Sequence, residues 1–234
     1  AGDTVVEIGS NDGTFLKVFQ SLGLDVLGID GSKKSSDIAL IEDVPVIQQF
    51  FGHGIASAVQ ESLKPGSRIG LILAMNVLAH TDNINEFLPE VSALMDAETV
   101  FVSQSHWLVA LIQGFEFDTV YHEHLRYYTL TSLVKLLGRH GLNIFDAEIT
   151  DFYGGSILCY AKNRQSEESE ALRSILAPLS RRIWTISLLP FKAAKCSGYA
   201  PSELASLFGS IPESNNSWTT SLCPLSIAVS RSLV

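Results

Sequence analysis

The chain has 234 residues, of which 46% are hydrophobic and 18% charged, as is typical of a globular protein with a substantial core. Its formal net charge of −9 argues against a nucleic-acid-binding surface, and no stretch approaches the roughly 18 consecutive apolar residues that predict a membrane span. The three cysteines are widely spaced and form no CxxC pair, so neither a metal site nor a disulfide framework is expected. These features favour a cytoplasmic protein. The chain opens on a core strand without a leader, which suggests that a further portion precedes it.

Residues 4–16, TVVEIGSNDGTFL, predict a buried strand over 4–8, a tight turn over 9–13 and a helix that begins at Thr14. Glycine has no Cβ and tolerates positive φ, so the turn allows the backbone to approach a ligand closely. The first N–H groups of the following helix point to the same place. Strand, glycine turn and helix together are the usual geometry of a nucleotide site at the carboxyl end of a strand.

Strands and helices then alternate, which predicts an α/β fold with a mostly parallel sheet and helices on both faces. Further strands are expected at 25–30, 44–48, 69–74 and 99–102, and helices at 14–22, 55–63 and 84–95. Right-handed crossovers place every strand-to-helix loop at the carboxyl edge of the sheet. The segments expected to line that edge are 9–13, Asp30, Phe51, 76–80 and 103–106.

A helix is predicted over 131–140, followed by two strands at 144–149 and 156–161 that could pair antiparallel. A polar break at 163–170 divides the sequence into a first domain, 1–164, and a second unit, 165–234, in which a helix over 171–191 is interrupted by two prolines. The end of the second unit is rich in serine and shows little periodicity.

The glycine turn lacks the GxGxxG spacing of a dinucleotide fold and the Lys-Ser/Thr of a P-loop. Glu7 lies inside the apolar strand, Asp12 lies within the turn, and Asp30 ends the second strand at the distance expected of an acid that binds ribose hydroxyls. Acids around the turn would repel a pyrophosphate and favour a ligand with a ribose and a positive charge. S-adenosylmethionine fits this description better than NAD or another nucleotide.

A second motif is FDTVYHEHL at 117–125, which crowds polar side chains together. His122 and His124 are two apart, without the i, i+4 spacing of a helical zinc site or an obvious third ligand. The alternative without a catalytic function is a solvated loop with one capping histidine. The composition of the motif favours general acid–base catalysis by a histidine beside a carboxylate or tyrosine. His80 and also His106 are expected to face the same cleft. His53 and His140 are expected at the surface or at a helix end.

Five segments now occur in an order and spacing that resemble the nucleotide-deoxysugar C-methyltransferase family, which belongs to the class I S-adenosylmethionine-dependent methyltransferases. They are VVEIGSNDGTFL, GID at 28–30, LILAMNVLAH at 71–80, FDTVYHEHLRYYTL at 117–130 and YGGSILCYA at 153–161. The similarity covers roughly residues 3–164, and GYAPSELASLF at 198–208 resembles the start of the family's C-terminal sugar-nucleotide domain. The resemblance implies a Rossmann-like methyltransferase sheet over 1–164 and a partial or truncated sugar-nucleotide-binding α/β segment over 165–234.

The same resemblance implies C-methylation at C3 of a nucleotide-linked 4-keto deoxysugar, with S-adenosylmethionine as cofactor. His124 would remove the C3 proton, Tyr121 and Glu123 would contact the sugar and steady the enolate, and His80 would lie nearby. The cofactor-binding residues would be Glu7, Gly9, Asn11, Asp12, Gly13, Asp30, Phe51 and Asn76, with Phe51 by the adenine and Asn76 beside the sulfonium.

The sequence also departs from the family pattern. It lacks the cysteine-rich zinc module, and Tyr153, Leu158 and Ser103 stand where the family has a histidine, an arginine and an acid. Two alternatives therefore stay open, a methyltransferase with an oxygen or nitrogen acceptor and a degenerate relative without catalysis. The expected partner is a small nucleotide sugar, and the chain is expected to be a monomer or a weak homo-oligomer.

Overall fold

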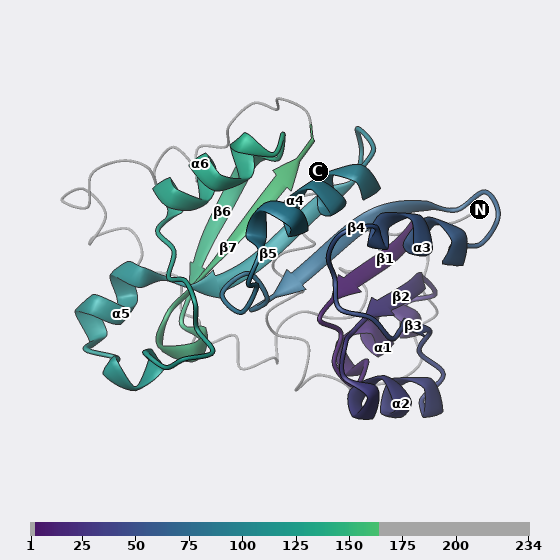
Figure 1. Ribbon diagram of the computed structural model, residues 1–234, viewed down its shortest axis with the longest axis horizontal. Coiled ribbons are helices and arrows are strands. Elements are labelled where there is room, and N and C mark those ends of the chain that lie inside the picture. Colours follow the sequence, from purple (N-terminus) through teal and green to yellow (C-terminus); the bar gives the residue numbers. More distant parts are fainter. Residues whose placement is uncertain (1–2, 164–234) are drawn as a thin grey trace.

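The computed structural model describes residues 3–163, which form a seven-stranded sheet of order β3-β2-β1-β4-β5-β7-β6 (Figure 1). The strands are β1 (Asp3–Ile8), β2 (Asp25–Ile29), β3 (Val46–Ile47), β4 (Arg68–Met75), β5 (Val100–His106), β6 (Asn143–Thr150) and β7 (Ser156–Lys162). The helices are α1 (Thr14–Ser21), α2 (Lys33–Ile41), α3 (Ile55–Ser62), α4 (Ile84–Leu94), α5 (Leu108–Gly114) and α6 (Leu130–Arg139), with short 3₁₀ turns at Phe117–Thr119 and Phe152–Gly154. The expectations for 165–234 lie outside the described residues.

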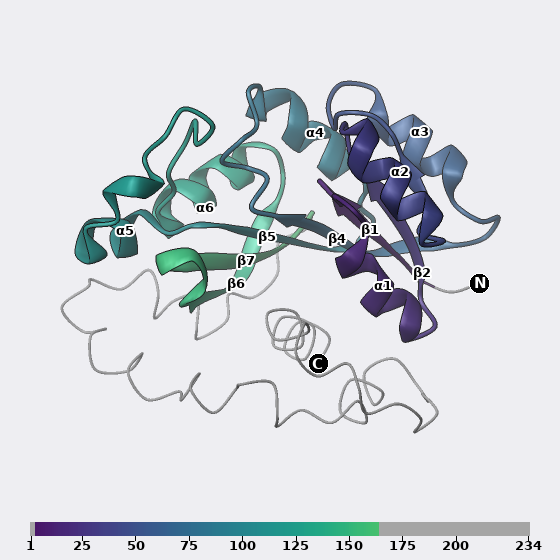
Figure 2. The ribbon, with the colours of Figure 1, turned by 90° about the horizontal axis from the view of Figure 1, so that it is seen from below.

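Helices cover both faces of the sheet, as the alternation of strands and helices predicts. Figure 2 shows α3, α4 and α6 on one side of the sheet and α1 on the other. The buried side chains of α1 and α2 pack in one apolar cluster, and those of α3, α4 and α6 pack in a second. Because β1 lies between these clusters, five of its six residues are buried, which explains the apolar side chains of Val5, Val6 and Ile8.

Strand pairing brings the carboxyl ends of the central strands to one edge. The strands β1, β2, β3, β4 and β5 are parallel, and β1 lies between β2 and β4 with Ile8 opposite Ile29 and Ala74. Among the seven strands of residues 3–163, β7 alone runs the other way: it is inserted between β5 and β6 and pairs antiparallel with both, so β6 runs in the same direction as the first five strands. The antiparallel pairing of the strands near 144–149 and 156–161 is therefore confirmed.

The sequence reading missed two helices and shortened one strand. In α2 only Ser36 and Ala39 are buried, so its apolar face is too narrow to give a clear periodicity. The seven-residue α5 has one buried residue, Leu111, and lies beyond the end of β5 (Figure 1). The segment 103–106 was expected in a loop, but it continues β5, and its polar side chains are buried because β7 pairs along it.

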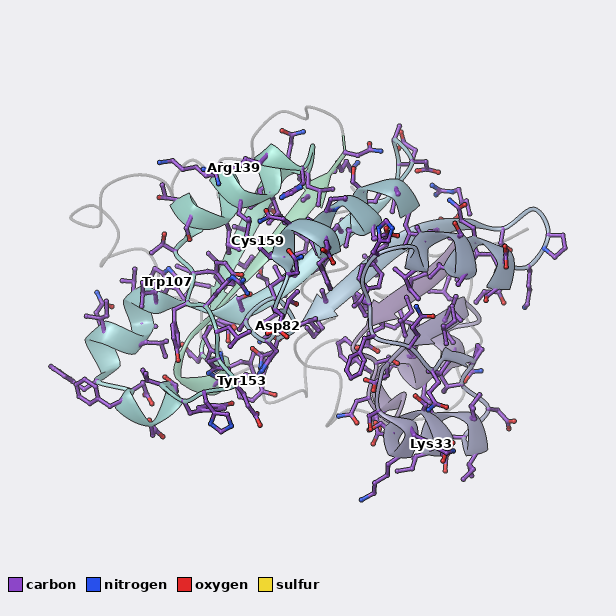
Figure 3. The ribbon with its side chains drawn as sticks, viewed as in Figure 1. Lys33, Asp82, Trp107, Arg139, Tyr153 and Cys159 are labelled. Carbon is purple, nitrogen blue, oxygen red and sulfur yellow. The ribbon has the colours of Figure 1, made fainter. Side chains whose placement is uncertain are left out.

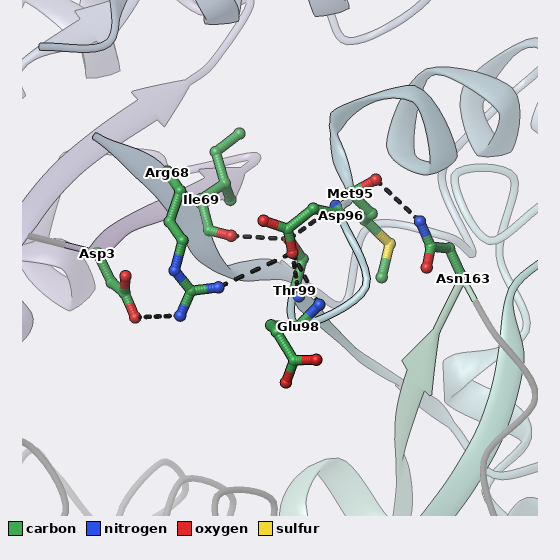
Figure 4. Close-up of polar contacts among 8 residues, drawn as sticks. All are labelled: Asp3, Arg68, Ile69, Met95, Asp96, Glu98, Thr99 and Asn163. Atoms are coloured by element: carbon green, nitrogen blue, oxygen red, sulfur yellow. Dashed lines mark hydrogen bonds and ion pairs between the residues drawn. The ribbon is translucent and has the colours of Figure 1, made fainter. Parts of the chain in front are cut away.

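Polar contacts fix the opposite edge of the sheet, where β4 and β5 begin (Figure 4). The hydroxyl of Thr99 donates to the Ile69 carbonyl at 2.7 Å, and the Asp96 carboxylate accepts from the Thr99 N–H at 2.8 Å. The amide of Asn163 donates to the Met95 carbonyl at 2.9 Å. These bonds hold the sheet together away from the edge where the candidate site lies. Within residues 3–163, no helix is long and apolar enough to cross a membrane.

Candidate active site at the carboxyl edge of the sheet

The turn after β1 is built from residues in left-handed backbone conformations. Gly9, Asn11 and Gly13 have φ angles of 71°, 52° and 76°. The N–H of Gly9 donates to the Ile29 carbonyl at 2.8 Å, which ties the turn to the end of β2. A Cβ on Gly9 would lie only 2.8 Å from Cγ2 of Val77, so the turn abuts the loop that follows β4. Glycine at position 9 is therefore required by both the backbone angle and the close approach.

Asp30 braces the glycine turn from the tip of β2. One carboxylate oxygen accepts the N–H of Asn11 at 2.9 Å, and the other accepts the N–H of Ser32 at 2.8 Å. Within the turn, the Asp12 carboxylate accepts the N–H of Thr14 at 3.1 Å at the start of α1. Asp12 and Asp30 are only partly buried, so both remain accessible to a ligand at this edge.

Glu7 lies beneath the turn and is only 4% exposed. Its Oε2 atom is buried and has no hydrogen-bond partner. Burial raises the pKa of Glu7 to about 8, and the nearby Asp12 and Asp30 carboxylates add to this effect. A buried carboxyl with an unused oxygen would be stabilised in its charged form by a cation close to the turn.

Two aromatic residues follow β3 and take different positions. The ring of Phe51 is partly buried and packs against Phe87 of α4, with ring centroids 4.7 Å apart. Phe50 is 82% exposed and lies over Gly31, next to Asp30. The structure thus gives Phe51 a packing role in the core, and Phe50 is the exposed aromatic ring beside Asp30.

The loop after β4 joins the glycine turn to the segment that contains the histidine motif. Asn76 is left-handed, with φ 57°, and its N–H donates to the Gln104 carbonyl of β5 at 3.0 Å. The N–H of Leu125 donates to the Ala79 carbonyl at 2.9 Å, and the hydroxyl of Tyr128 donates to the Leu78 carbonyl at 3.2 Å. Segments that are far apart in the sequence therefore meet at this edge.

His124 is buried, and both of its ring nitrogens have partners. Nδ1 lies 2.8 Å from the Thr119 carbonyl oxygen, and Nε2 lies 3.0 Å from the hydroxyl oxygen of Tyr121. A carbonyl oxygen can only accept, so Nδ1 carries the proton and, in the neutral ring, Nε2 presents its lone pair. The hydroxyl of Tyr127 also donates to the Thr119 carbonyl, at 3.1 Å, and steadies the oxygen that fixes the tautomer.

Two further histidine rings lie beside His124. The centroid of the exposed His80 is 4.8 Å from that of His124, and the centroid of the buried His106 is 4.6 Å away. The ring of Tyr153 lies 5.8 Å from His106 at the same end of the sheet (Figure 3). The pKa of His106 lies below its usual range. Burial is the largest cause, and the neighbouring rings of His124 and His80 lower it further. The lowered pKa favours the neutral form of the His106 ring.

Of the residues expected from the motif at 117–125, the structure brings Tyr121 and His124 together and leaves Glu123 and His122 exposed. The sequence did not indicate roles for Thr119 and Tyr127. Thr119 acts through its backbone carbonyl, which every residue has, and Tyr127 lies outside the motif at 117–125. His140 caps the end of α6 and contacts the side chain of Asn85, while His53 lies at the surface. Among residues 3–163, no set of three or more His, Cys, Asp or Glu side chains is arranged to hold a metal ion.

Residues 1–147 match the profile of a family described as methyltransferase domain. The chain is also 35% identical over 161 residues to the C-methyltransferase NovU of Streptomyces niveus, an alignment that covers 68% of this chain and 37% of that protein. The chain therefore spans little more than a third of the length of this curated relative.

Solved structures of similar fold include a SAM-dependent methyltransferase from Thermotoga maritima, at a TM-score of 0.52 and 14% identity, covering 70% of this chain and 83% of that one. Another is the magnesium protoporphyrin IX methyltransferase ChlM of Synechocystis PCC 6803 with bound SAH, at a TM-score of 0.50 and 18% identity, covering 69% of this chain and 74% of that one. At these identities the likeness concerns the fold alone, a Rossmann-like methyltransferase sheet.

Proposed function

The chain belongs to the methyltransferase domain family, and from this premise we propose that it is an S-adenosylmethionine-dependent C-methyltransferase acting at C3 of a nucleotide-linked 4-keto deoxysugar. The similarity to a C-methyltransferase supports transfer to carbon. In the proposed protein, residues 1–164 bind the cofactor and carry out catalysis, and residues 165–234 form part of a sugar-nucleotide-binding domain. The protein is proposed to be a monomer or a weak homo-oligomer.

The residues at the glycine turn fit S-adenosylmethionine. Gly9 and Gly13 supply the left-handed backbone of the turn at which the methionine end is proposed to lie, Asn11 and Asp12 shape the turn, and the unpartnered Oε2 of Glu7 suits a cation above it. In this proposal Asp30 binds the ribose hydroxyls, Asn76 lies near the sulfonium, and Phe51 or the more exposed Phe50 lies by the adenine. When bound, S-adenosylmethionine supplies an electrophilic methyl group, and the sulfur keeps the electron pair of the broken S–C bond.

His124 is the proposed general base, and its hydrogen bonding is the observation that carries the proposal. With its proton on Nδ1, donated to the Thr119 carbonyl, the neutral ring has a lone pair on Nε2. A neutral imidazole has the basicity to accept a proton near neutral pH. The contact with Tyr121 shows that Nε2 is within reach of a hydroxyl group that approaches from the more exposed side.

The 4-keto group of the sugar acidifies the hydrogen on C3. The Nε2 lone pair of His124 takes that proton, the C3–H electron pair forms the C3–C4 double bond, and the carbonyl π pair moves to the oxygen. The chain thereby generates an enolate whose C3 is the nucleophile. Tyr121 and Glu123 are proposed to bind the sugar, and the exposed His80, whose ring lies beside that of His124, to pass the proton on to solvent. C3 must face the cofactor at near-attack distance.

The test is to incubate the full chain with ¹³C-methyl S-adenosylmethionine and a thymidine-diphospho-4-keto-6-deoxyhexose and to locate the label by NMR. We expect the ¹³C methyl signal to couple to C3 of the sugar. Label on an oxygen or nitrogen would replace this proposal with the alternative acceptor class. No transfer, together with no binding of S-adenosylhomocysteine by calorimetry, would indicate a non-catalytic relative.

A further inference from the structure

His106 is the last residue of β5, and its ring lies between those of His124 and Tyr153. Its ring packs on His124 at 4.6 Å between centroids and on Tyr153 at 5.8 Å. Its backbone pairs with Ser156 of β7, and the next N–H, that of Trp107, donates to the Gly155 carbonyl at 3.0 Å. The strand pairing therefore fixes the position of His106 beside the proposed base more firmly than a loop could.

His106 is only 6% exposed, yet its hydrogen-bonding groups are not all paired. Its Nδ1 atom is buried without a hydrogen-bond partner, although buried polar groups are normally paired. An orphaned buried N–H is rarer than an under-used acceptor, so the proton of the neutral ring belongs on Nε2. Nε2 makes no hydrogen bond to any residue in the described range 3–163, which leaves an N–H donor available at the site.

We propose that His106 is a further catalytic residue, a neutral imidazole whose Nε2–H donates to the C4 oxygen of the substrate as that oxygen becomes an enolate. This inference rests on the proposed C-methyltransferase function. The hydrogen removed by His124 and the carbonyl oxygen are attached to adjacent carbons, so two adjacent rings can serve them at once. A donor aimed at an oxygen where negative charge develops stabilises the transition state more than the ground state.

A neutral donor suits this position because His124 becomes positively charged when it takes the proton. A second imidazolium at 4.6 Å would repel that charge and weaken the base. The rings of His124, from the motif segment, and of Tyr153, from the turn before β7, pack on His106, and His80, from the loop after β4, acts on it electrostatically. Desolvation and the two imidazoles lower the pKa of His106, which agrees with a ring that stays neutral at pH 7.

The first test is structural and independent of turnover. Long-range ¹H–¹⁵N correlation spectra of the ¹⁵N-histidine-labelled chain at pH 7 report which nitrogen of each ring is protonated, and His106→Gln assigns the signals of His106. We expect His106 with its proton on Nε2 and His124 with its proton on Nδ1. A proton on Nδ1 of His106, or a doubly protonated ring, would overturn the inference.

The second test measures deuterium uptake at C3 of the thymidine-diphospho-4-keto-6-deoxyhexose in D₂O. His106→Phe keeps a ring without a donor, and His106→Gln places an amide N–H near the position of Nε2. Loss of one oxyanion donor should slow the exchange by about 10²–10³-fold in His106→Phe, with binding of the sugar nucleotide nearly unchanged. His106→Gln should restore exchange to within about 10-fold of wild type, as expected when an equivalent donor is supplied.

Equal exchange in His106→Phe and wild type would refute a role for His106 while leaving the function intact. An effect of His106→Phe that His106→Gln does not relieve would also refute the donor role. Failure of the function itself looks different, because then the wild-type chain shows no exchange above the buffer control. Thermal melting and binding of S-adenosylhomocysteine, both expected to be unchanged, show that each variant is folded.

Discussion

The Nε2 atom of His124 lies 3.0 Å from the hydroxyl oxygen of Tyr121, and the two rings are 4.2 Å apart. The lone pair proposed to take the substrate proton is therefore engaged by a phenol. Tyr121 is 42% exposed, so its side chain has room to turn away. We propose that the sugar displaces the Tyr121 hydroxyl from His124 as it binds, and that the hydroxyl then contacts the sugar.

Tyr121→Phe tests this exchange of partners. The Nδ1 bond to Thr119 still fixes the tautomer of His124, so proton removal at saturating substrate should persist within about 10-fold. The lost hydroxyl contact should raise the KM for the sugar nucleotide by about 3- to 10-fold, the value of one hydrogen bond. Steady-state kinetics separates the two effects. A large fall in kcat with KM unchanged would instead make Tyr121 part of the proton transfer.

Asp30→Ala should weaken binding of S-adenosylhomocysteine by about 10- to 100-fold, since a hydrogen bond to a charged group is worth roughly 1.5–3 kcal/mol. Asp30 also holds the N–H groups of Asn11 and Ser32, so the turn loosens as well. Asp37→Ala is the matched control, because Asp37 is an exposed carboxylate on the nearby α2 whose partner is Lys33. Titration calorimetry should find the affinity of the control unchanged. Equal affinity in both variants would remove Asp30 from the cofactor site.

Gly9→Ala combines an unfavourable backbone angle with a steric conflict. The φ of 71° alone should cost roughly 1–2 kcal/mol of stability for any residue with a Cβ. The added Cβ would also meet Cγ2 of Val77 and push the turn away from the loop after β4. Gly23→Ala is the control, because its φ is 82° but nothing lies within 4 Å of the new Cβ.

Both glycine variants should melt at lower temperature than wild type, but only Gly9→Ala should lose binding of S-adenosylhomocysteine, by more than about 10-fold, or 1.4 kcal/mol. Similar binding by the two variants would mean that the close contact with Val77 does not shape the site.

Glu7→Gln should change how stability depends on pH. The pKa of Glu7 is raised to about 8 in the folded chain, so between its ordinary pKa of 4.5 and 8 the folded state holds a proton that the unfolded state has released. The free energy of unfolding must then fall as pH rises through this window, and level off above it. Glutamine does not titrate, so its stability advantage over wild type should grow between pH 5 and 8.5.

The advantage should reach a few kcal/mol, at about 1.4 kcal/mol for each pKa unit. Urea unfolding of both chains at pH 5.0, 7.0 and 8.5 measures it. Parallel pH profiles would show that Glu7 is ionised in the folded protein without this penalty.

Much of the fold follows from local pattern. Short, largely apolar segments such as 4–8 and 69–74 are typical of buried central strands, and glycines or prolines mark where helices end, so the sheet and most of its helices are predictable. The alternation fails at Ser103–His106, since the burial of these polar residues depends on β7, which pairs with them from about 50 residues later. The β-propensity of a short sequence segment does not reveal which distant strand will pair with it.

The candidate site likewise contains some residues that the sequence indicates and others that only the fold reveals. Gly9, Asp30 and His124 are visible in the sequence because their residue types are unusual for the positions they occupy. Thr119 acts through its backbone carbonyl, which no sequence pattern reveals. His106 was expected near the same cleft, but only the fold shows that its ring packs on His124. Phe50 and Phe51 are neighbours in the sequence, and only the packing of Phe51 on Phe87 tells them apart.

Removal of a carbon-bound proton by His124 can be followed by NMR as deuterium uptake at C3 of a thymidine-diphospho-4-keto-6-deoxyhexose in D₂O. The wild-type chain should exchange this hydrogen well above the rate of buffer alone, and His124→Ala should lose about 10²–10⁴-fold of that rate. His122→Ala, which removes the exposed histidine two positions earlier, should exchange like wild type. Undiminished exchange in His124→Ala would show that His124 is not the base that removes this proton.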